Sequence, residues 1–217
     1  MENQLRAAFL GMKRQEAMDL VKAEIERGTD PLAVLRVCRQ AMEEVGKRFE
    51  SGEFFLSELI YSGEVFKGVN ILLEPALKAS HAVDTAQGAV VFGTPKGDIH
   101  DLGKNIVITM MKAHGFTVHD LGVDVPPQKF IAELKRTEAP ILAMSALITP
   151  TFKSMKEITS ILEQEGMRKK TYVIIGGAVT SGFVQKEVGA DAQTLDPTEA
   201  IRLCRTFLSS GNPSADR

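Results

Sequence analysis

GAVVFGTPKGDIHDLGKNIVITMMKAH, residues 88–114, joins a short apolar run to a helical pattern through a polar loop. The run Val90–Phe92 is typical of a buried strand, and the pattern that follows the loop has helical spacing. His100 lies in the loop, two residues after Asp98, where it is poorly placed for core packing. It is well placed to bind a metal through one ring nitrogen while a carboxylate holds the other. Gly103 leaves open space in which a bulky group can approach the backbone.

The chain after this stretch keeps the same alternation. We expect strands at 90–92, 117–122, 141–145, 172–175 and 192–195, and helices at 105–113, 128–136, 151–165 and 200–208. Alternating strands and helices predict a parallel sheet with right-handed crossovers and helices on both faces. The predicted fold class is therefore α/β, with a flavodoxin-like (Rossmann-type) parallel five-stranded sheet domain. Ligands bind such sheets at the carboxyl ends of the strands, near the point where strand order reverses.

The part of the chain before residue 85 has helical periodicity only. Apolar residues recur at helical spacing over 5–27, 31–50 and 55–77. Asp30 and Pro31 are typical of a helix start, and Pro75 is expected to bend or end the last helix. Three or four helices of this kind predict a small N-terminal helical bundle. We place the bundle at residues 1–85, the α/β domain at 86–211 and a tail at 212–217.

Composition excludes several kinds of partner. The 217 residues are 44% apolar and carry a formal net charge of −2, which gives no general attraction to nucleic acid or anionic lipid. No apolar run reaches the length of a membrane span, and the N-terminal residues lack the features of a signal peptide. Cys38 and Cys204 lie in apolar helical patterns and are expected to be buried thiols in a reducing compartment. We therefore expect a cytoplasmic protein.

Glycines and polar side chains gather in the loops that follow three predicted strands. These loops are residues 98–103, 145–151 and 176–180. If the strands are neighbours, the loops surround one cavity lined by a histidine, several hydroxyls and a Gly-Gly pair. Glycines allow a large, flat group to run close to the backbone, so the expected ligand is larger than a metal ion.

The same segments resemble the cobalamin-binding motifs of corrinoid proteins. Residues 97–107, GDIHDLGKNIV, are similar to the family's Asp-x-His-x-x-Gly motif. Residues 144–151, MSALITPT, resemble its second loop, and residues 175–178, IGGA, resemble its third. Residues 120–126, DLGVDVP, fit the segment that follows its second strand.

The helical part resembles the bundle that caps the corrinoid in this family. The matching segments are residues 46–50, 54–58 and 73–75. The resemblance covers about residues 5–208, in the order that the family shows. It is greatest to the small corrinoid proteins of methyltransferase systems and to the matching module of cobalamin-dependent methionine synthase.

The resemblance implies that cobalamin is bound base-off and His-on. In this family the cofactor releases its own dimethylbenzimidazole from cobalt and a protein histidine replaces it; here that metal ligand is His100. Asp98 is expected to accept the hydrogen bond from the other ring nitrogen. Thr151 stands where relatives often have serine as the third member of this relay. Because the protonation of His100 is coupled to Asp98, the ligand can follow the redox state of cobalt, and we expect His100, Asp98 and Thr151 to be the catalytic residues.

The resemblance also implies a channel for the nucleotide tail of the cofactor. Ser145 is expected to hydrogen-bond the tail, and Gly176 and Gly177 to let it run between strands. The expected cofactor-binding residues are Asp98, His100, Asp101, Gly103, Ser145, Leu147, Thr149, Thr151, Gly176, Gly177 and Ala178. Four of these also fit plainer roles: Asp98 and Asp101 suit a helix start, and Ser145 and Thr149 suit a strand end and a helix cap. We adopt the plainer role for Asp101 and prefer the relay for Asp98, whereas capping and contact with the tail are compatible at Ser145 and Thr149.

The function implied by the resemblance is that of a methyl carrier, which is not catalytic alone. A substrate-specific methyltransferase is expected to load the methyl group, and a second methyltransferase to pass it to a thiol or to tetrahydrofolate, with a reductive activase as a further partner. The bundle is expected to cover the upper face of the corrin and to move about a hinge near residues 79–87. Methylamines, methanol and methoxylated aromatic compounds are all open as donors, and no nucleic acid or membrane partner is expected.

Two other functions share this module and stay open. One is a cobalamin-dependent sensor or regulator, although no basic recognition helix is visible in the sequence. The other is a mutase subunit, which needs a barrel domain that a separate chain could supply. A phosphoacceptor receiver domain is excluded, because Ser145 stands where such a domain needs an aspartate at the end of its third strand.

Overall fold

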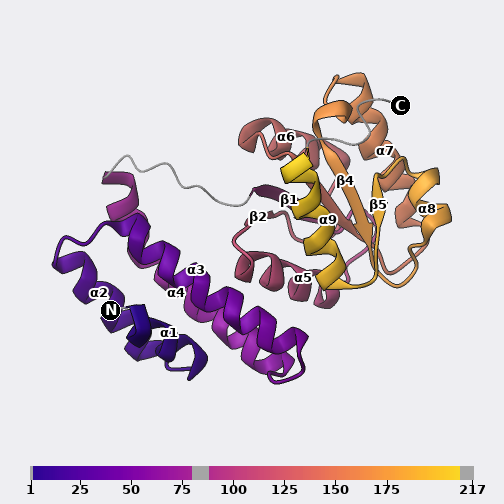
Figure 1. Cartoon of the computed structure of the whole chain (residues 1–217). Coiled ribbons are helices and arrows are strands. Elements are labelled where there is room, and N and C mark those ends of the chain that lie inside the picture. The colour runs from indigo at the N-terminus through magenta and orange to yellow at the C-terminus, as the bar shows by residue number, and fades with distance from the viewer. Residues whose placement is uncertain (1, 80–87, 211–217) are drawn as a thin grey trace. The chain divides into compact units, whose positions relative to one another are not determined.

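The computed structural model describes residues 2–79 and 88–210, which form two compact units, one all-helical and one built on a sheet (Figure 1). The chain has the predicted fold class, an N-terminal helical bundle followed by a flavodoxin-like sheet domain. The predicted domain boundaries after residues 85 and 211, the tail, and all but the first residue of the predicted hinge lie outside the described residues.

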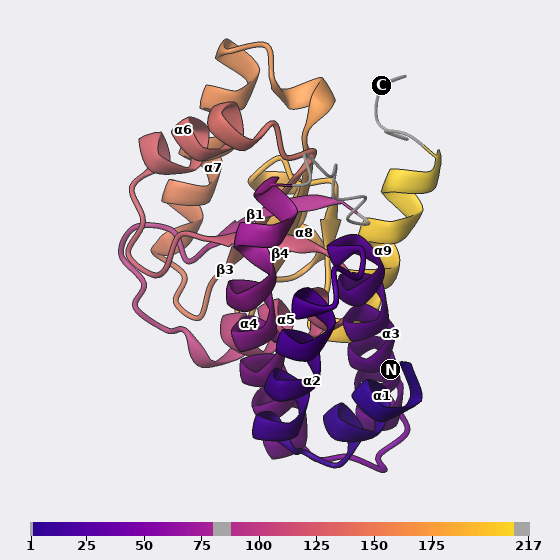
Figure 2. The same cartoon turned by 90° about the vertical axis from the view of Figure 1, so that its left-hand side faces the viewer.

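Within residues 2–79, four helices form the N-terminal unit: α1 (Glu2–Leu10), α2 (Arg14–Glu26), α3 (Pro31–Glu50) and α4 (Leu56–Ala79). α1 packs against α3, α2 against α4, and α3 along α4, so the helices lie side by side (Figure 2). Apolar residues spaced at helical intervals fill the space between them, among them Leu5, Phe9, Val21, Cys38 and Met42. The hydrophobic pattern thus accounts for the bundle, because each helix buries its apolar face against its neighbours.

The helix predicted over residues 5–27 is wrong in one respect, since the chain forms two helices there. It turns at Gly11–Lys13, where Met12 has a positive φ of 57°. The backbone N–H of Lys13 closes this turn on the carbonyl oxygen of Ala8 at 2.8 Å. α1 and α2 bury apolar residues in the same core, so apolar spacing continues across the turn and periodicity alone does not reveal it. Gly11 is the local signal for the break.

The start of α3 and the end of α4 test two predictions about helix boundaries. The side chain of Asp30 accepts the backbone N–H of Leu32 at 3.1 Å, and Pro31 occupies the first turn, as predicted. Pro75 does not end its helix, because α4 continues to Ala79. The sequence therefore gives the start of α3 correctly, and the end of α4 lies beyond the position that Pro75 suggests.

Five parallel strands form the sheet: β1 (Ala89–Gly93), β2 (Thr117–Asp120), β3 (Ile141–Ser145), β4 (Tyr172–Gly176) and β5 (Ala192–Gln193). Their order is β2-β1-β3-β4-β5, and all neighbouring pairs are parallel. This is the flavodoxin-like order, in which the direction of the chain's progress reverses between β1 and β3. The loops after β1 and β3 therefore leave the sheet side by side, as the sequence predicts.

In the described residues 88–210, five α-helices surround the sheet: α5 (Leu102–Ala113), α6 (Pro127–Thr137), α7 (Thr151–Gln164), α8 (Gly182–Glu187) and α9 (Pro197–Ser210). α5 and α9 lie on one face and α6 and α7 on the other (Figure 1). Successive strand residues point to opposite faces: Val91 packs in the core with α6 and α7, whereas Phe92 faces α5. α8, capped by Ser181, was not predicted, because six residues are too few to show helical periodicity.

The two cysteines are buried and free, as predicted. Burial raises the pKa of the Cys38 and Cys204 thiols to about 12. Each thiol is therefore protonated at neutral pH and unreactive.

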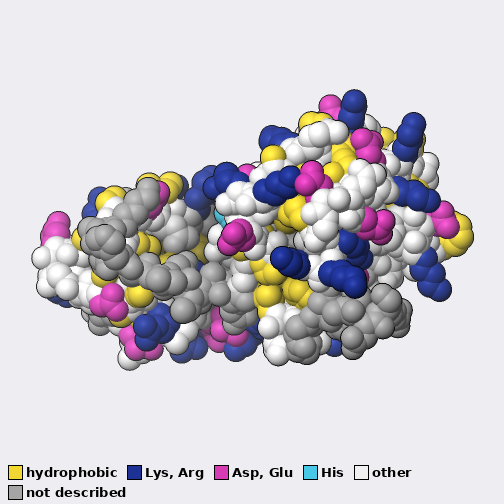
Figure 3. Space-filling model, turned by 90° about the horizontal axis from the view of Figure 1, so that it is seen from above, with side chains coloured by type: hydrophobic (Ala, Val, Ile, Leu, Met, Phe, Trp, Pro, Cys, Tyr) yellow, Lys and Arg dark blue, Asp and Glu magenta, His cyan; other side chains and the backbone are white. Residues whose placement is uncertain are grey.

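The face of the molecule seen in Figure 3 has mixed charge. On the face seen in Figure 3, Lys and Arg side chains are interspersed with Asp and Glu, in keeping with the net charge of −2. Within residues 2–79 and 88–210, no helix is both long enough and apolar enough to span a membrane.

Candidate functional site

His100 lies in the loop between β1 and α5, and Asp98 fixes its ring. Nδ1 of His100 is 2.6 Å from Oδ1 of Asp98, and the same oxygen accepts the backbone N–H of His100 at 3.0 Å. The Asp98 side chain is fully buried, whereas the side chain of His100 is 52% exposed. No group in the described part of the chain bonds to Nε2. With its proton on Nδ1 toward Asp98, the imidazole keeps the Nε2 lone pair for a metal.

The second oxygen of Asp98 joins this loop to the loop after β3. Oδ2 accepts the backbone N–H of Leu147 at 2.6 Å. Burial alone would raise the pKa of the Asp98 carboxyl, but the N–H groups of Leu147 and His100 and the His100 ring together lower this pKa below its usual value. Asp98 is thus held as a carboxylate, the form that accepts all three hydrogen bonds.

Thr151, the predicted third relay residue, forms no hydrogen bond with Asp98 in this structure. It is fully buried at the start of α7, and its Oγ1 has no hydrogen-bond partner among the described residues. Ser154, in the same turn of the helix, also has a buried hydroxyl without a partner there. Buried hydroxyls without partners are uncommon. The first turn of α7 is therefore a place that can hold a further polar group, and the relay role of Thr151 stays a prediction.

Apolar side chains on the surface accompany the exposed imidazole. Ile99 is 74% exposed, Leu102 70% and Leu147 42%. Ile99 directly precedes His100 in the loop, Leu102 is the first residue of α5, and Leu147 is the residue whose N–H binds Asp98. Large apolar side chains gathered on a surface usually mark a binding site. The face around His100 therefore suits a broad, largely apolar ligand.

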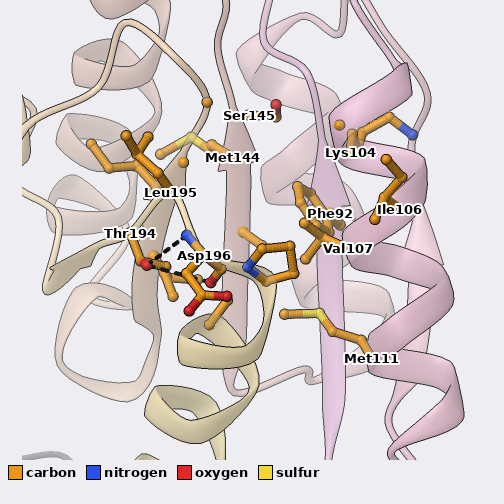
Figure 4. A pocket seen from close by; sticks show the side chains of 18 residues that line it. Phe92, Lys104, Ile106, Val107, Met111, Met144, Ser145, Thr194, Leu195 and Asp196 are labelled. Carbon is orange, nitrogen blue, oxygen red and sulfur yellow. Dashed lines mark hydrogen bonds between the residues drawn. The ribbon is translucent and has the colours of Figure 1, made fainter. Parts of the chain in front are cut away.

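A cavity of about 170 Å³ opens between the sheet, α5 and the start of α9 (Figure 4). It is much larger than the roughly 10–15 Å³ that one water molecule needs. Four of the predicted site residues line it: Gly103, Ser145, Gly176 and Gly177. Most of the other lining residues are apolar, among them Phe92, Val107, Met111, Ala143, Ile174 and Ala200. The cavity therefore suits a flat, mainly apolar group that enters between the strands and the helices.

Sequence reasoning named Gly103 as a site residue but missed the residues that continue the walls of this cavity. Gly103, Val107 and Met111 line it from α5, where a spacing of four residues places them on one face of the helix. That spacing is visible in the sequence and could have identified the wall. The opposite wall comes from residues 194–197, which are the loop after β5 and the first residue of α9. The sequence predicts a strand over residues 192–195, but β5 ends at Gln193, so residues 194 and 195 belong to this loop instead.

The three glycines of the site differ in what a side chain would meet at each position. A Cβ on Gly177 would collide with the carbonyl oxygen of Ala146, and its φ of +105° is strained for other residues. A Cβ on Gly176 would come within 2.9 Å of the carbonyl oxygen of Thr194. Gly103 has nothing within 4 Å of such a Cβ. Gly177 and Gly176 are thus required by close backbone packing, whereas Gly103 leaves space open toward the cavity.

Asp101, Thr149 and Ala178 are exposed and do not line the cavity. The carboxylate of Asp101 accepts the side-chain N–H of Asn105 at 3.1 Å, and its carbonyl oxygen accepts the backbone N–H of Asn105 at 2.8 Å. The carbonyl oxygen of Thr149 accepts the backbone N–H of Phe152 at 3.1 Å. Asp101 and Thr149 thus take part in helix starts, and contact of these three residues with a cofactor stays a prediction.

No cluster of three or more His, Cys, Asp or Glu side chains that could hold a metal ion occurs within residues 2–79 and 88–210. His100 can donate one bond to a metal. A metal at His100 would therefore take its remaining ligands from another group, as the iron of haem takes most of its ligands from the macrocycle.

Comparison with known proteins matches both units. A family model described as a B12 binding domain matches residues 88–202, and a second model of the same description matches residues 1–74. A dimethylamine corrinoid protein of Methanosarcina mazei is 37% identical over 169 residues, which cover 77% of this chain and 100% of the relative.

Two solved structures have the same fold. A cobalamin-binding protein from Desulfitobacterium hafniense is 31% identical with a TM-score of 0.68, over 95% of this chain and 98% of that chain. A chain in the methanol:cobalamin methyltransferase complex of Methanosarcina barkeri is 24% identical with a TM-score of 0.87, over 96% of this chain and 80% of that one. The chain therefore belongs to the family of B12-binding corrinoid proteins, which take part in methyl transfer, and its cofactor is cobalamin.

Proposed function

We propose that this chain holds cobalamin base-off, with His100 as the axial ligand of cobalt, and carries a methyl group between two methyltransferases. The observation that supports this most directly is the half-exposed imidazole of His100, whose Nδ1 is fixed by the buried carboxylate of Asp98 at 2.6 Å. It leaves one unpaired ring nitrogen in a loop at the switch point of the sheet, where ligands bind in this fold.

The residues around His100 fit the shape of this cofactor. Ile99, Leu102 and Leu147 offer exposed apolar surface against which the lower face of a corrin ring can lie. The cavity between α5, the sheet and α9 can take the displaced nucleotide tail, with Ser145 in reach of its polar atoms. The buried hydroxyl of Thr151, which has no hydrogen-bond partner among the described residues, is available for a further hydrogen bond.

Bound cobalamin supplies a cobalt centre that accepts and releases methyl groups. The protein controls the axial ligand. With cobalt on Nε2 of His100, Asp98 would accept the Nδ1 hydrogen bond and make the imidazole a better donor. With a proton on Nε2 instead, the same carboxylate would stabilise the positive charge of the imidazolium, because it lies buried beside the ring. Asp98 thus supports both states of His100.

The first partner, in this proposal, is a methyltransferase specific for a methylated amine. The similarity to a dimethylamine corrinoid protein over the full length of that relative favours this class of donor. The second partner is a methyltransferase that passes the methyl group to a thiol or to tetrahydrofolate, and a reductive activase restores the cofactor. The shared fold of a chain in a methanol:cobalamin methyltransferase complex supports association with a methyltransferase of this kind.

The test is reconstitution of the purified chain with hydroxocobalamin, followed by gel filtration and visible spectroscopy. We expect the chain to retain the cofactor and to show the spectrum of a histidine-ligated, base-off form, and His100→Gln to retain cofactor without that spectrum. After reduction, dimethylamine should methylate the cofactor only when a dimethylamine-specific methyltransferase is added. A chain that takes up no corrinoid, or identical spectra for parent and His100→Gln, would contradict the proposal.

A further inference from the structure

We propose that Asp124 is a positioning residue for the axial ligand: it fixes the loop that carries Asp98 and His100, and so sets how firmly His100 binds cobalt. This inference rests on the proposed function, since it takes His100 to be the ligand.

Asp124 lies in the loop between β2 and α6 and is bonded twice to the loop that carries His100. Oδ1 of Asp124 accepts the backbone N–H of Gly97 at 2.8 Å. Its own backbone N–H donates to the carbonyl oxygen of Asp98 at 2.9 Å. Asp98 is therefore held at both ends, by Asp124 at its backbone and by the Leu147 N–H at its carboxylate.

The backbone of Asp124 has an uncommon conformation, with a φ of 51°. Aspartate tolerates this left-handed region better than most residues, because its side chain is short and polar. Gly97, whose backbone N–H donates to the Asp124 carboxylate, also has a positive φ, of +96°. Such conformations persist where the surroundings enforce them, and they cluster at functional sites. Gly97 lies directly before Asp98 and is hydrogen-bonded to Asp124, so two residues of positive φ hold the start of the His100 loop in one shape.

The loop that carries Asp124 is itself well anchored. Thr94 and Val125 join the two loops, because the N–H of Val125 donates to the carbonyl oxygen of Thr94 at 3.0 Å. Lys104, which is 2% exposed, places Nζ 2.6 Å from Oδ1 of Asp120. That oxygen also accepts the N–H of Gly122 at 2.9 Å. Asp124 therefore acts from a fixed support, so its two bonds restrain the His100 loop instead of moving with it.

Loss of these restraints has a chemical consequence at His100. Residues that orient a metal ligand typically change metal affinity by about 10–100-fold when they are removed. If the Gly97 N–H loses its acceptor, the loop gains freedom and Nε2 is held less well beneath the cobalt. Protons then compete more effectively for Nε2. The pH at which His100 leaves the cobalt should therefore rise.

The experiment titrates the full chain, loaded with methylcobalamin, from neutral to acidic pH and follows the visible spectrum for loss of the axial histidine. Asp124→Ala and Asp124→Gly should raise the midpoint by about one pH unit, which is a tenfold weaker ligation. Asp124→Asn keeps an acceptor oxygen and tolerates the same φ, so its midpoint should return close to that of the parent.

Glu138→Ala is the matched control. Glu138 is exposed, has a φ of 52° at the end of α6, and lies away from the His100 loop in sequence. Its replacement by alanine imposes the same kind of backbone strain as Asp124→Ala and should leave the midpoint unchanged. Asp124→Gly tests the loss of the carboxylate without backbone strain, because glycine adopts a positive φ freely.

Several outcomes would overturn the inference. Midpoints of Asp124→Ala and Asp124→Gly equal to that of the parent would show that Asp124 does not position the ligand, with the proposed function left intact. A shift in Asp124→Asn as large as that in Asp124→Ala would assign the effect to charge instead of the contact to Gly97. If the parent itself has no transition that His100→Gln abolishes, the proposed function fails, and this inference fails with it. Thermal unfolding of each cofactor-free variant checks that it folds, and Asp124→Gly decides the matter if Asp124→Ala does not fold.

Discussion

Asp98 is the residue on which the site depends most. It brings together two loops that follow neighbouring strands, through Leu147 on one side and His100 on the other. A buried carboxylate is tolerated only when hydrogen bonds to its charged form offset the loss of water. All three of its hydrogen bonds come from groups at the site, so the same contacts that keep Asp98 ionised also fix the orientation of the His100 ring.

Replacing Asp98 by asparagine should lower the free energy of unfolding of the cofactor-free protein at neutral pH by about 1–3 kcal/mol, because buried N–H groups lose a charged partner. The pKa of Asp98 is lower in the folded chain than in the unfolded chain. Its contribution is therefore complete above the unfolded-state pKa, about 4, and is lost as the pH falls through the lower folded-state pKa.

Urea denaturation of parent and Asp98→Asn across the acidic range measures this. The difference between the two free energies of unfolding should be constant above about pH 5 and should shrink below about pH 4. A difference that persists unchanged at the acid end would mean that ionisation of Asp98 does not stabilise the fold.

At the scale of elements, the glycines at the carboxyl ends of the strands and the start of α5 serve two purposes. Gly177 is needed for packing of the fold, whereas Gly103, in our proposal, leaves space for the cofactor. Gly177→Ala should destabilise the protein by about 1–3 kcal/mol, because the residue needs a positive φ and the new Cβ would collide with Ala146. Gly103→Ala should leave stability unchanged or slightly higher, because it adds a methyl group in open space within α5.

Corrinoid uptake then distinguishes their roles. Gly103→Ala should fold like the parent and bind hydroxocobalamin more weakly, because the methyl group occupies space next to the cavity. Denaturant titration and equilibrium binding on the same two variants measure both effects. Full corrinoid affinity in Gly103→Ala would show that this opening is not part of the site.

α5 forms one wall of the cavity, and its inner face gives a second test at this scale. Val107→Phe should place a ring in the space assigned to the nucleotide tail. The variant should fold, since the space is there to accept it, but should lose tight retention of cobalamin after gel filtration. Val107→Ala is the control and should retain the cofactor, because it enlarges the same cavity. Equal retention by both variants would place the tail elsewhere.

At the scale of the whole molecule, periodicity and alternation predict the architecture, because each helix or strand buries one face against a shared core. They do not predict breaks that leave the apolar pattern intact, such as the turn at Met12 between α1 and α2. They also miss α8, which is too short to show a period, and the loop after β5, which has no regular structure and completes the cavity.

The site follows the same rule. The contact between Asp98 and His100 is predictable, because the two residues share one loop. The bond from Asp98 to the Leu147 N–H is not, because the donor is a backbone group 49 residues away whose position only the folded sheet determines. The Asp124 contact to Gly97 is hidden for a similar reason, since it joins loops that follow different strands.

The most direct test of the central claim is electron paramagnetic resonance of the chain loaded with cobalamin and reduced to the Co(II) state. In that state the unpaired electron couples to the axial nitrogen. Protein grown with nitrogen-15 histidine should show a doublet splitting in place of the triplet given by nitrogen-14, and His100→Gln should lose the effect of the label. A triplet that the histidine label leaves unchanged would mean that the cofactor's own base still binds cobalt, and would contradict the account.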